Sequence, residues 1–442
     1  MQRENKAKKK VFFVTNNARM MLVFRREMLE AFTAIYEVTI VSPKDPESEK
    51  TLSEIGCRFI SCEVDRRGTN PIKDAQLITR YFRIFKKEKP DAIVSFTIKP
   101  NIYAGFAARV LSIPFIATVE GLGSGWENAG ILSKVVQRLY GFGLEGANIV
   151  FVLNQHIFDE LARVGVKKEK MKFLPGMGVN LEYFAAVPYP KDEDTLRLLT
   201  VGRVMREKGF LELIGAAHRL EVELPNLVWH VVGAPEVNER DFIEKLKACK
   251  NVIYHGPQSD VRPYYAMCHA TTTATYHEGM STVCLEAAAS ARPVLGTNEF
   301  GVRETFVEGI TGFGIKKGDV ADTVRVIKNF FAIPNSERAA MGEKARSYAE
   351  ENFDRNKVTW SYFAVLMSIF AEESSENLTA SLASITATSR LPAEVVPLKE
   401  DTVPETLERF IAKCNSVSQS RGSSASVGWA RTKIGVSAGS NF

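Results

Sequence analysis

The chain of 442 residues is 45% hydrophobic and 25% charged, and because its length exceeds that of a single hydrophobic core we expect two globular domains. Its net charge of +5 is uneven: residues 1–185 carry 28 basic and 20 acidic side chains, and the remainder carries 29 and 32. The basic first half favours an anionic partner, such as a phosphorylated acceptor or a membrane surface, but the excess is too small, without a recognised motif, to indicate nucleic-acid binding.

The six cysteines stand at irregular spacings and form no Cys-x-x-Cys pair. This pattern argues against a disulfide framework or a zinc site and fits a reducing cytoplasm. No signal peptide opens the sequence, and no apolar run approaches the length of a membrane span. We therefore expect a cytoplasmic protein, either soluble or peripheral at the inner face of the plasma membrane.

Strands and helices alternate through the first half of the chain, which predicts a parallel sheet. The strands are expected at residues 10–15, 36–41, 58–64, 91–97, 114–120 and 148–153. The first strand-to-helix turn lacks the Gly-x-Gly-x-x-Gly fingerprint, which argues against a nicotinamide or flavin enzyme. Lys99 and Glu120 follow two of these strands, at the sheet edge where doubly wound folds contact ligands.

A helix predicted at residues 72–87 interleaves aromatic and aliphatic side chains with lysines and arginines. Such a helix is typical of a basic amphipathic segment that touches a membrane. The pattern is also typical of a helix that packs on a sheet and leaves its basic face in water. We favour this second interpretation.

Residues 186–195 are rich in proline and charge, and we expect them to link a first domain at 10–185 to a second at 196–355. Asp192 and Asp194 have the composition of an acidic metal-binding pair. Because they end no predicted strand and lie in the expected hinge, we predict no metal site there.

The second half begins another series of strands, at residues 196–202, 228–232, 252–255, 270–276 and 293–297. Arg203 and Lys208 flank the turn between the first of these strands and a helix predicted at 210–220. Two cations and free helix amides at a strand end would neutralise a pyrophosphate. The alternative is that both are ordinary surface charges.

Gly279 permits a tight turn into a helix predicted at residues 282–291, with Ser281 as its N-cap. Glu286 has no lysine or arginine three or four residues away, so no ion pair within the helix explains its charge. One interpretation is an anion-binding site at the helix N-terminus. The other is that Glu278 complements the helix dipole and Glu286 is solvated, and spacing alone does not decide between them.

Taken together, these motifs resemble those of the retaining family 4 glycosyltransferases of the GT-B fold, from about residue 10 to residue 370. The matching residues, in the family's order and spacing, are Gly202-Arg203, Lys208-Gly209, Glu278-Gly279, Glu286 and Arg292-Pro293-Val294. Residues 95–103 and 121–123 are similar to the bacterial branch that builds capsule, lipopolysaccharide or glycans on undecaprenyl diphosphate. Ala291 stands where the family commonly has glycine.

The resemblance implies an α/β chain in which two Rossmann-like, doubly wound domains face a central cleft. A closing helix at 356–373 would complete the fold, and the Ser-, Thr-, Ala- and Gly-rich tail at 374–442 is expected to be mostly disordered. The first domain would hold the acceptor and the second a nucleotide sugar, most often UDP-linked, as co-substrate, with no other cofactor and no metal.

The resemblance also implies roles for individual residues. Arg203 and Lys208 would hold the diphosphate and stabilise the charge of the departing group. Glu286 would accept both ribose hydroxyls, and Glu278 would face the donor sugar near the developing oxocarbenium ion. The expected donor site comprises Arg203, Lys208, Glu278, Gly279, Met280, Ser281, Thr282 and Glu286, of which Glu278, Arg203 and Lys208 are the catalytic candidates. Acceptor contacts are expected at Arg67, Lys99 and Glu120.

The function implied is transfer of a hexose or N-acetylhexosamine from a UDP-sugar to a lipid-diphosphate-linked saccharide, with retention by front-face attack. The two glutamates would then not form the acid/base couple of a glycosidase. Two alternatives stay open: a transferase of the same fold with a soluble acceptor, and a nucleotide-binding or scaffolding protein that has lost turnover.

Overall fold

The computed structural model describes residues 8–66, 68, 70–123, 126, 130–192, 194–236, 239 and 241–372. The chain divides into two compact units, of which the first comprises Met1–Leu174 with Val358–Phe442 and the second Pro175–Lys357. The tail expected at 374–442 lies outside the described residues, as does Arg67.

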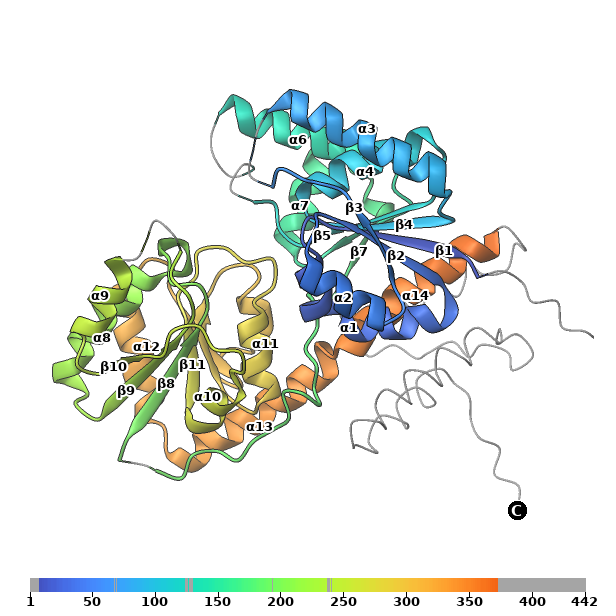
Figure 1. Cartoon of the computed structure of the whole chain (residues 1–442). Helices are drawn as coiled ribbons and strands as arrows, with labels where there is room; N and C mark the ends of the chain where they lie inside the picture. The colour runs from blue at the N-terminus through green and yellow to red at the C-terminus, as the bar shows by residue number, and fades with distance from the viewer. Residues whose placement is uncertain are drawn as a thin grey trace, which may run out of the picture. The chain divides into compact units, whose positions relative to one another are not determined.

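The first unit is built on a seven-stranded parallel sheet in the order β3-β2-β1-β4-β5-β6-β7 (Figure 1). Its strands are β1 (Lys10–Val14), β2 (Glu37–Ser42), β3 (Arg58–Ser61), β4 (Ala92–Phe96), β5 (Phe115–Val119), β6 (Ile149–Val152) and β7 (Met171–Phe173). Its helices are α1 (Ala18–Ile35), α2 (Pro46–Glu54), α3 (Pro71–Glu88), α4 (Ile98–Val110), α6 (Ile131–Leu144), α7 (Gln155–Arg163), the 3₁₀ turn η1 (Lys168–Lys170) and most of α14 (Arg355–Glu372).

Helices cover both faces of this sheet, with α3, α4 and α6 on one side and α1, α2 and α14 on the other (Figure 1). The central strands β4 and β5 are therefore buried along their whole length. This explains why their sequences are nearly continuous apolar runs rather than alternating ones.

The second unit repeats the plan with a six-stranded parallel sheet in the order β10-β9-β8-β11-β12-β13. Its strands are β8 (Leu196–Val201), β9 (Leu227–Val232), β10 (Val252–Tyr254), β11 (Ala270–Thr273), β12 (Val294–Thr297) and β13 (Gly312–Ile315). Its helices are α8 (Phe210–Glu223), α9 (Asp241–Ala248), α10 (Arg262–Met267), α11 (Thr282–Ala289), α12 (Val320–Ala332) and α13 (Asn335–Asn352), with 3₁₀ turns η2 (Arg206–Lys208) and η3 (Arg303–Thr305).

In this sheet the strand order reverses between β8 and β11, which is where doubly wound sheets bind ligands at their carboxyl ends. Helices α8, α9 and α12 cover one face, and α10, α11 and α13 lie on the other (Figure 1). Leu198, Trp229, Ala270 and Phe330 contribute to the apolar core. The predicted fold class, two doubly wound parallel units, is confirmed.

The division of the chain differs from the predicted linker at 186–195, because it falls at Leu174–Pro175. Side chains of the second unit hold the intervening segment: Arg346 donates to the carbonyls of Leu181 and Phe184. Arg292 likewise donates to the carbonyls of Val187 and Pro188 at 3.0 and 2.7 Å. Side chains of the second unit thus hold both the end of the segment expected in the first domain and part of the expected linker.

The final helix, α14, packs mainly on the first unit. Tyr362 and Thr118 share a hydrogen bond of 2.6 Å between their hydroxyl groups. The ring of Phe363 contacts those of Phe32 and Tyr36. The predicted closing helix therefore returns to the unit in which the chain begins.

Helix α3 has a buried apolar face and an exposed basic face, as the favoured packing interpretation predicts. Leu77, Tyr81 and Phe85 form its buried face, while Lys86 and Lys87 are exposed. Among the described residues, no helix combines the length and the hydropathy that crossing a bilayer requires.

Candidate active site

The turn after β8 is fixed against the end of β11. Gly209 has φ +74°, and a Cβ at this position would stand 2.0 Å from the carbonyl oxygen of Ala274. The amide of Tyr276 donates to the carbonyl of Glu207 at 2.9 Å. A glycine is required for this close approach, which sets Lys208 beside the carboxyl end of the neighbouring strand.

Lys208 and Glu278 form an ion pair across this edge. The Lys208 Nζ lies 2.5 Å from Glu278 Oε1, and the two side chains are 25% and 21% exposed. They come from the turns that follow β8 and β11, the strands between which the sheet order reverses. The structure thus brings together two residues that stand 70 positions apart in the sequence.

Arg203 lies in the same turn but pairs elsewhere. Its Nη1 is 2.7 Å from Glu236 Oε2, and the arginine side chain is 57% exposed. Within the described part of the chain, no contact joins it to Lys208 or Glu278. Joint binding of a diphosphate by Arg203 and Lys208 therefore stays a prediction. It requires Arg203 to leave Glu236 and pair with the ligand instead.

The loop that carries Gly279 and Met280 packs tightly on its neighbours. Gly301 has φ +81°, and a Cβ there would meet the carbonyl oxygen of Glu278 at 2.3 Å. The amide of Ser281 donates to the Gly301 carbonyl at 2.6 Å, and Met280 is buried. These contacts hold Glu278 in place, although it lies outside regular secondary structure.

Ser281 occupies the N-cap of α11, as predicted, but its side chain makes no capping hydrogen bond. Thr282 begins the helix. The first amides of a helix have no partner within it, so this N-terminus presents free donors next to Glu278. Donors in this arrangement favour an anion.

Helix α11 ends at Ala289, before the predicted end at residue 291. Ala291 adopts φ +59°, a left-handed conformation that favours glycine, and the amide of Arg292 donates back to the carbonyl of Ala287 at 2.9 Å. The C-terminal turn explains in backbone terms why glycine suits position 291.

Glu286 is held by a neutral partner. Its Oε2 accepts a hydrogen bond of 2.9 Å from the hydroxyl of Tyr265, which is fully buried on α10. Although the residue keeps some exposed surface, protein atoms surround the carboxyl group, and this burial raises its pKa to about 7. The Tyr265 hydrogen bond and the charge of Arg355 oppose the increase. A carboxylate poised near neutrality is suited to accept hydrogen bonds from a ligand.

The candidate acceptor residues of the first unit are also paired. Lys99 Nζ lies 2.6 Å from Asp74 Oδ1, with both side chains largely buried. Glu120 Oε1 lies 2.9 Å from Nη2 of Arg25, which is buried. The guanidinium of Arg25 also stacks 4.3 Å above the ring of Phe96.

The sequence interpretation missed Arg25, Asp74 and Tyr265. Arg25 had a usable signal, because it stands on the apolar stripe of α1 with Met21 and Phe32, where an arginine must find a buried partner. Asp74 and Tyr265 carried no comparable signal.

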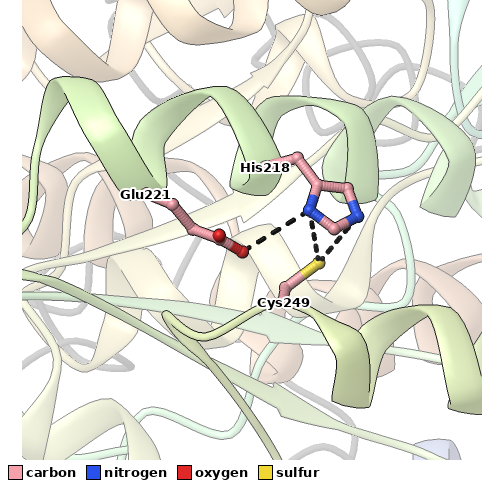
Figure 2. Close-up of side chains that lie close together, drawn as sticks. All are labelled: His218, Glu221 and Cys249. Carbon is pink, nitrogen blue, oxygen red and sulfur yellow. Dashed lines mark hydrogen bonds and ion pairs between the residues drawn. The ribbon is translucent and has the colours of Figure 1, made fainter.

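Among the described residues, one group of side chains is close enough to hold a metal ion: His218, Glu221 and Cys249 (Figure 2). It includes none of the predicted donor residues. Asp192, the first residue of the acidic pair in the linker, instead forms an ion pair of 2.8 Å with Arg197. The contact gives Asp192 a structural role.

Comparison with known proteins identifies both halves of the chain. A model of the glycosyl transferases group 1 family matches residues 185–348, and a model of the glycosyl transferase 4-like domain matches residues 23–176. The chain is 26% identical to the capsular polysaccharide biosynthesis glycosyltransferase CapM of Staphylococcus aureus over 320 residues. This aligned region covers 68% of this chain and 82% of CapM.

A second relative is the N,N'-diacetylbacillosaminyl-diphospho-undecaprenol alpha-1,3-N-acetylgalactosaminyltransferase of Campylobacter jejuni, 24% identical over 302 residues, or 65% of this chain and 79% of that one. The fold is similar to that of Anabaena Alr3699/HepE in complex with UDP, with a TM-score of 0.67 and 16% identity over 81% of this chain and 100% of that chain. Both halves of the chain match glycosyltransferase family models, and each half folds into a doubly wound unit. The chain therefore belongs to the family 4 glycosyltransferases of the GT-B fold.

Proposed function

We propose that this glycosyltransferase moves a hexose or N-acetylhexosamine from a UDP-sugar to a lipid-diphosphate-linked saccharide in the synthesis of a surface polysaccharide or glycan. The observation that carries the proposal is the Lys208–Glu278 ion pair beside the N-terminus of α11, with Glu286 on the same helix. A cation and free amides can bind the diphosphate of a nucleotide sugar, and carboxylates can accept hydrogen bonds from its hydroxyl groups.

In this proposal Glu286 binds the ribose of the nucleoside. A ribose offers two hydroxyl donors, and an ionised carboxylate can accept both. Because burial raises the pKa of Glu286 to about 7, the group is partly protonated near neutral pH. Hydrogen bonds from the ribose would favour the ionised form, so nucleotide binding releases a proton.

Lys208 binds the diphosphate in this proposal. When that anion binds, Lys208 exchanges Glu278 for a phosphate oxygen, and the freed carboxylate turns to the donor sugar. The amides of α11 and the guanidinium of Arg203 add positive charge where the leaving group develops its negative charge. This set of donors supports catalysis without a metal ion, since the leaving group is neutralised by protein groups.

The chemistry we propose retains the configuration of the sugar. The bond from the anomeric carbon to the diphosphate oxygen breaks, and a bond to the acceptor oxygen forms on the same face. The departing phosphate oxygen takes the proton of the acceptor hydroxyl, so no protein base is required. Glu278 stabilises the positive charge that develops on the sugar.

The acceptor assignment draws on the names of relatives and on charge. The Campylobacter jejuni relative is named for an undecaprenol-diphosphate acceptor, and the first half of this chain is basic. We assign Lys99 and Glu120 of the first unit to acceptor contacts. A lipid-linked acceptor would bring the enzyme to the cytoplasmic face of the membrane, where the exposed lysines of α3 meet anionic headgroups.

The test is a panel of UDP- and GDP-sugars, each incubated with undecaprenyl-diphosphate-linked saccharides and with soluble oligosaccharides. We expect UDP release with one donor, only in the presence of a lipid-linked acceptor. Product anomer analysis by NMR should show the donor's configuration. Turnover with a soluble acceptor alone would contradict the acceptor assignment, and UDP binding without release under any condition would contradict enzymatic function.

A further inference from the structure

The side chains of His218, Glu221 and Cys249 converge at one point of the second unit (Figure 2). None of the three is among the residues assigned to the donor. His218 and Glu221 lie three positions apart on α8 and therefore share a helix face. Cys249 directly follows α9 and approaches them from the turn before β10.

The turn that carries Cys249 is anchored to α8. The amide of Lys250 donates to Glu221 Oε1 at 2.9 Å, and the side-chain amide of Asn251 donates to the carbonyl of Ala217 at 3.0 Å. Cys249 is buried, whereas the side chain of His218 is 51% exposed. The three groups are thus positioned before any ligand arrives, and one side of the cluster is open to water.

Two of the three pairs of ligand atoms lie at distances close to those around a small tetrahedral ion, and all three atoms lie within 4.8 Å of one another. Cys249 Sγ lies 3.8 and 3.6 Å from Nδ1 and Nε2 of His218, and His218 Nδ1 lies 3.4 Å from Glu221 Oε1. Zinc bonds of about 2.3 Å to sulfur and about 2.0–2.2 Å to nitrogen and oxygen place such ligand atoms about 3.3–3.6 Å apart. Only small side-chain movements would be needed.

We propose that His218, Glu221 and Cys249 bind a zinc ion, with water in the fourth position. Thiolate, imidazole and carboxylate are the ligands that zinc takes in proteins. Binding forms a zinc–sulfur bond and releases the thiol proton to solvent, so affinity rises with pH. The bound ion joins α8 to the turn after α9, and it stabilises the second unit without taking part in sugar transfer.

The sequence indicated no zinc site because its cysteines form no Cys-x-x-Cys pair. In this cluster a single cysteine is completed by a helical histidine and glutamate from another element. The site therefore emerges only once α8 and the turn after α9 are packed together.

The test is metal titration of the full-length protein after removal of metals with EDTA. We expect one equivalent of Zn²⁺ to bind with micromolar or tighter affinity, and one equivalent of Co²⁺ to give a thiolate-to-cobalt charge-transfer band. Cys249→Ser and His218→Asn should each abolish both signals. Cys62→Ser, which changes another buried cysteine in the first unit, is the matched control and should retain them.

A stability measurement supplies an independent readout. Zinc at about a hundred times its dissociation constant should raise the melting temperature of the second unit by about 5–10 °C, and His218→Asn should remove the shift. Absence of stoichiometric binding, or binding that persists in Cys249→Ser, would overturn the proposal. An equal thermal shift in wild type and His218→Asn would overturn it as well.

Discussion

Replacing Glu286 by glutamine should stabilise the second unit at alkaline pH. Burial raises the pKa of Glu286 from its ordinary value of 4.5 to about 7, so between these values the folded protein binds more protons than the unfolded chain. The stability of the wild type therefore falls as pH rises from 4.5 through 7, by about 3 kcal/mol in total. Glutamine is neutral throughout and still accepts the Tyr265 hydrogen bond, so Glu286→Gln avoids this loss.

Amide hydrogen exchange of the slowest peptides from β8, β9 and β11 measures the free energy of unfolding of this unit. We expect Glu286→Gln and wild type to differ little at pH 5 and by about 3 kcal/mol at pH 8, with the variant more stable. Glu343→Gln changes an exposed glutamate on α13 and serves as the control. Equal stability of Glu286→Gln and wild type at pH 8 would refute the reasoning.

The same substitution should weaken nucleotide binding. If the ribose requires the ionised carboxylate, the affinity of wild type for UDP should rise about tenfold between pH 6 and pH 8, as the ionised fraction of Glu286 rises. Isothermal titration calorimetry should show weaker binding by Glu286→Gln, without this additional pH dependence. Tight binding by the variant with an unchanged pH profile would remove Glu286 from the nucleotide site.

Three further predictions concern the rest of the chain. Ala291→Gly relieves a left-handed alanine and should stabilise the second unit by up to about 1 kcal/mol in denaturant unfolding; a loss of stability would contradict the backbone argument. Arg292→Met removes six hydrogen bonds from a buried guanidinium to carbonyl groups and should cost about 3 kcal/mol or more. Arg325→Met, which removes an exposed arginine of α12, should cost little. In flotation assays with anionic liposomes, the enzyme should bind at low salt and dissociate as salt rises, and replacing Lys86 and Lys87 on α3 by glutamine should weaken this binding. Failure to bind even at low salt would remove the membrane-surface proposal.

In the first unit the fold was predictable because the central strands β4 and β5 are nearly continuous apolar runs separated by helices. In the second unit β11 was predictable from its β-branched residues. The edge strands β7 and β13 escaped prediction, since Met171–Phe173 is only three residues long and Gly312–Ile315 is half glycine. The division between the two compact units, at Leu174–Pro175, precedes the predicted linker. The proline-rich composition of residues 186–195 suggested a free linker, whereas Arg292 binds the backbone of Val187 and Pro188 within this segment. Arg346 binds the backbone of Leu181 and Phe184 just before it.

For the candidate site, sequence spacing located the charged groups but not their partners. Lys208 and Glu278 could be placed at strand ends, and the parallel order of β8 and β11 then brings them together. The neutral hydroxyl of Tyr265 beside Glu286 depends on how α10 packs against α11, which no local pattern encodes. Pairing of Arg203 with Glu236 is a similar tertiary contact.

The most direct test of a UDP-sugar site built on Lys208 is single-turnover UDP release by Lys208→Ala, measured with the preferred donor and lipid-linked acceptor. Loss of one preorganised cation should lower the rate by about two orders of magnitude or more. Lys328→Ala, which removes an exposed lysine paired with Glu223 on the same unit, is the control and should keep the wild-type rate. Turnover by Lys208→Ala at the wild-type rate, or equal UDP release by wild type without acceptor, would contradict the account.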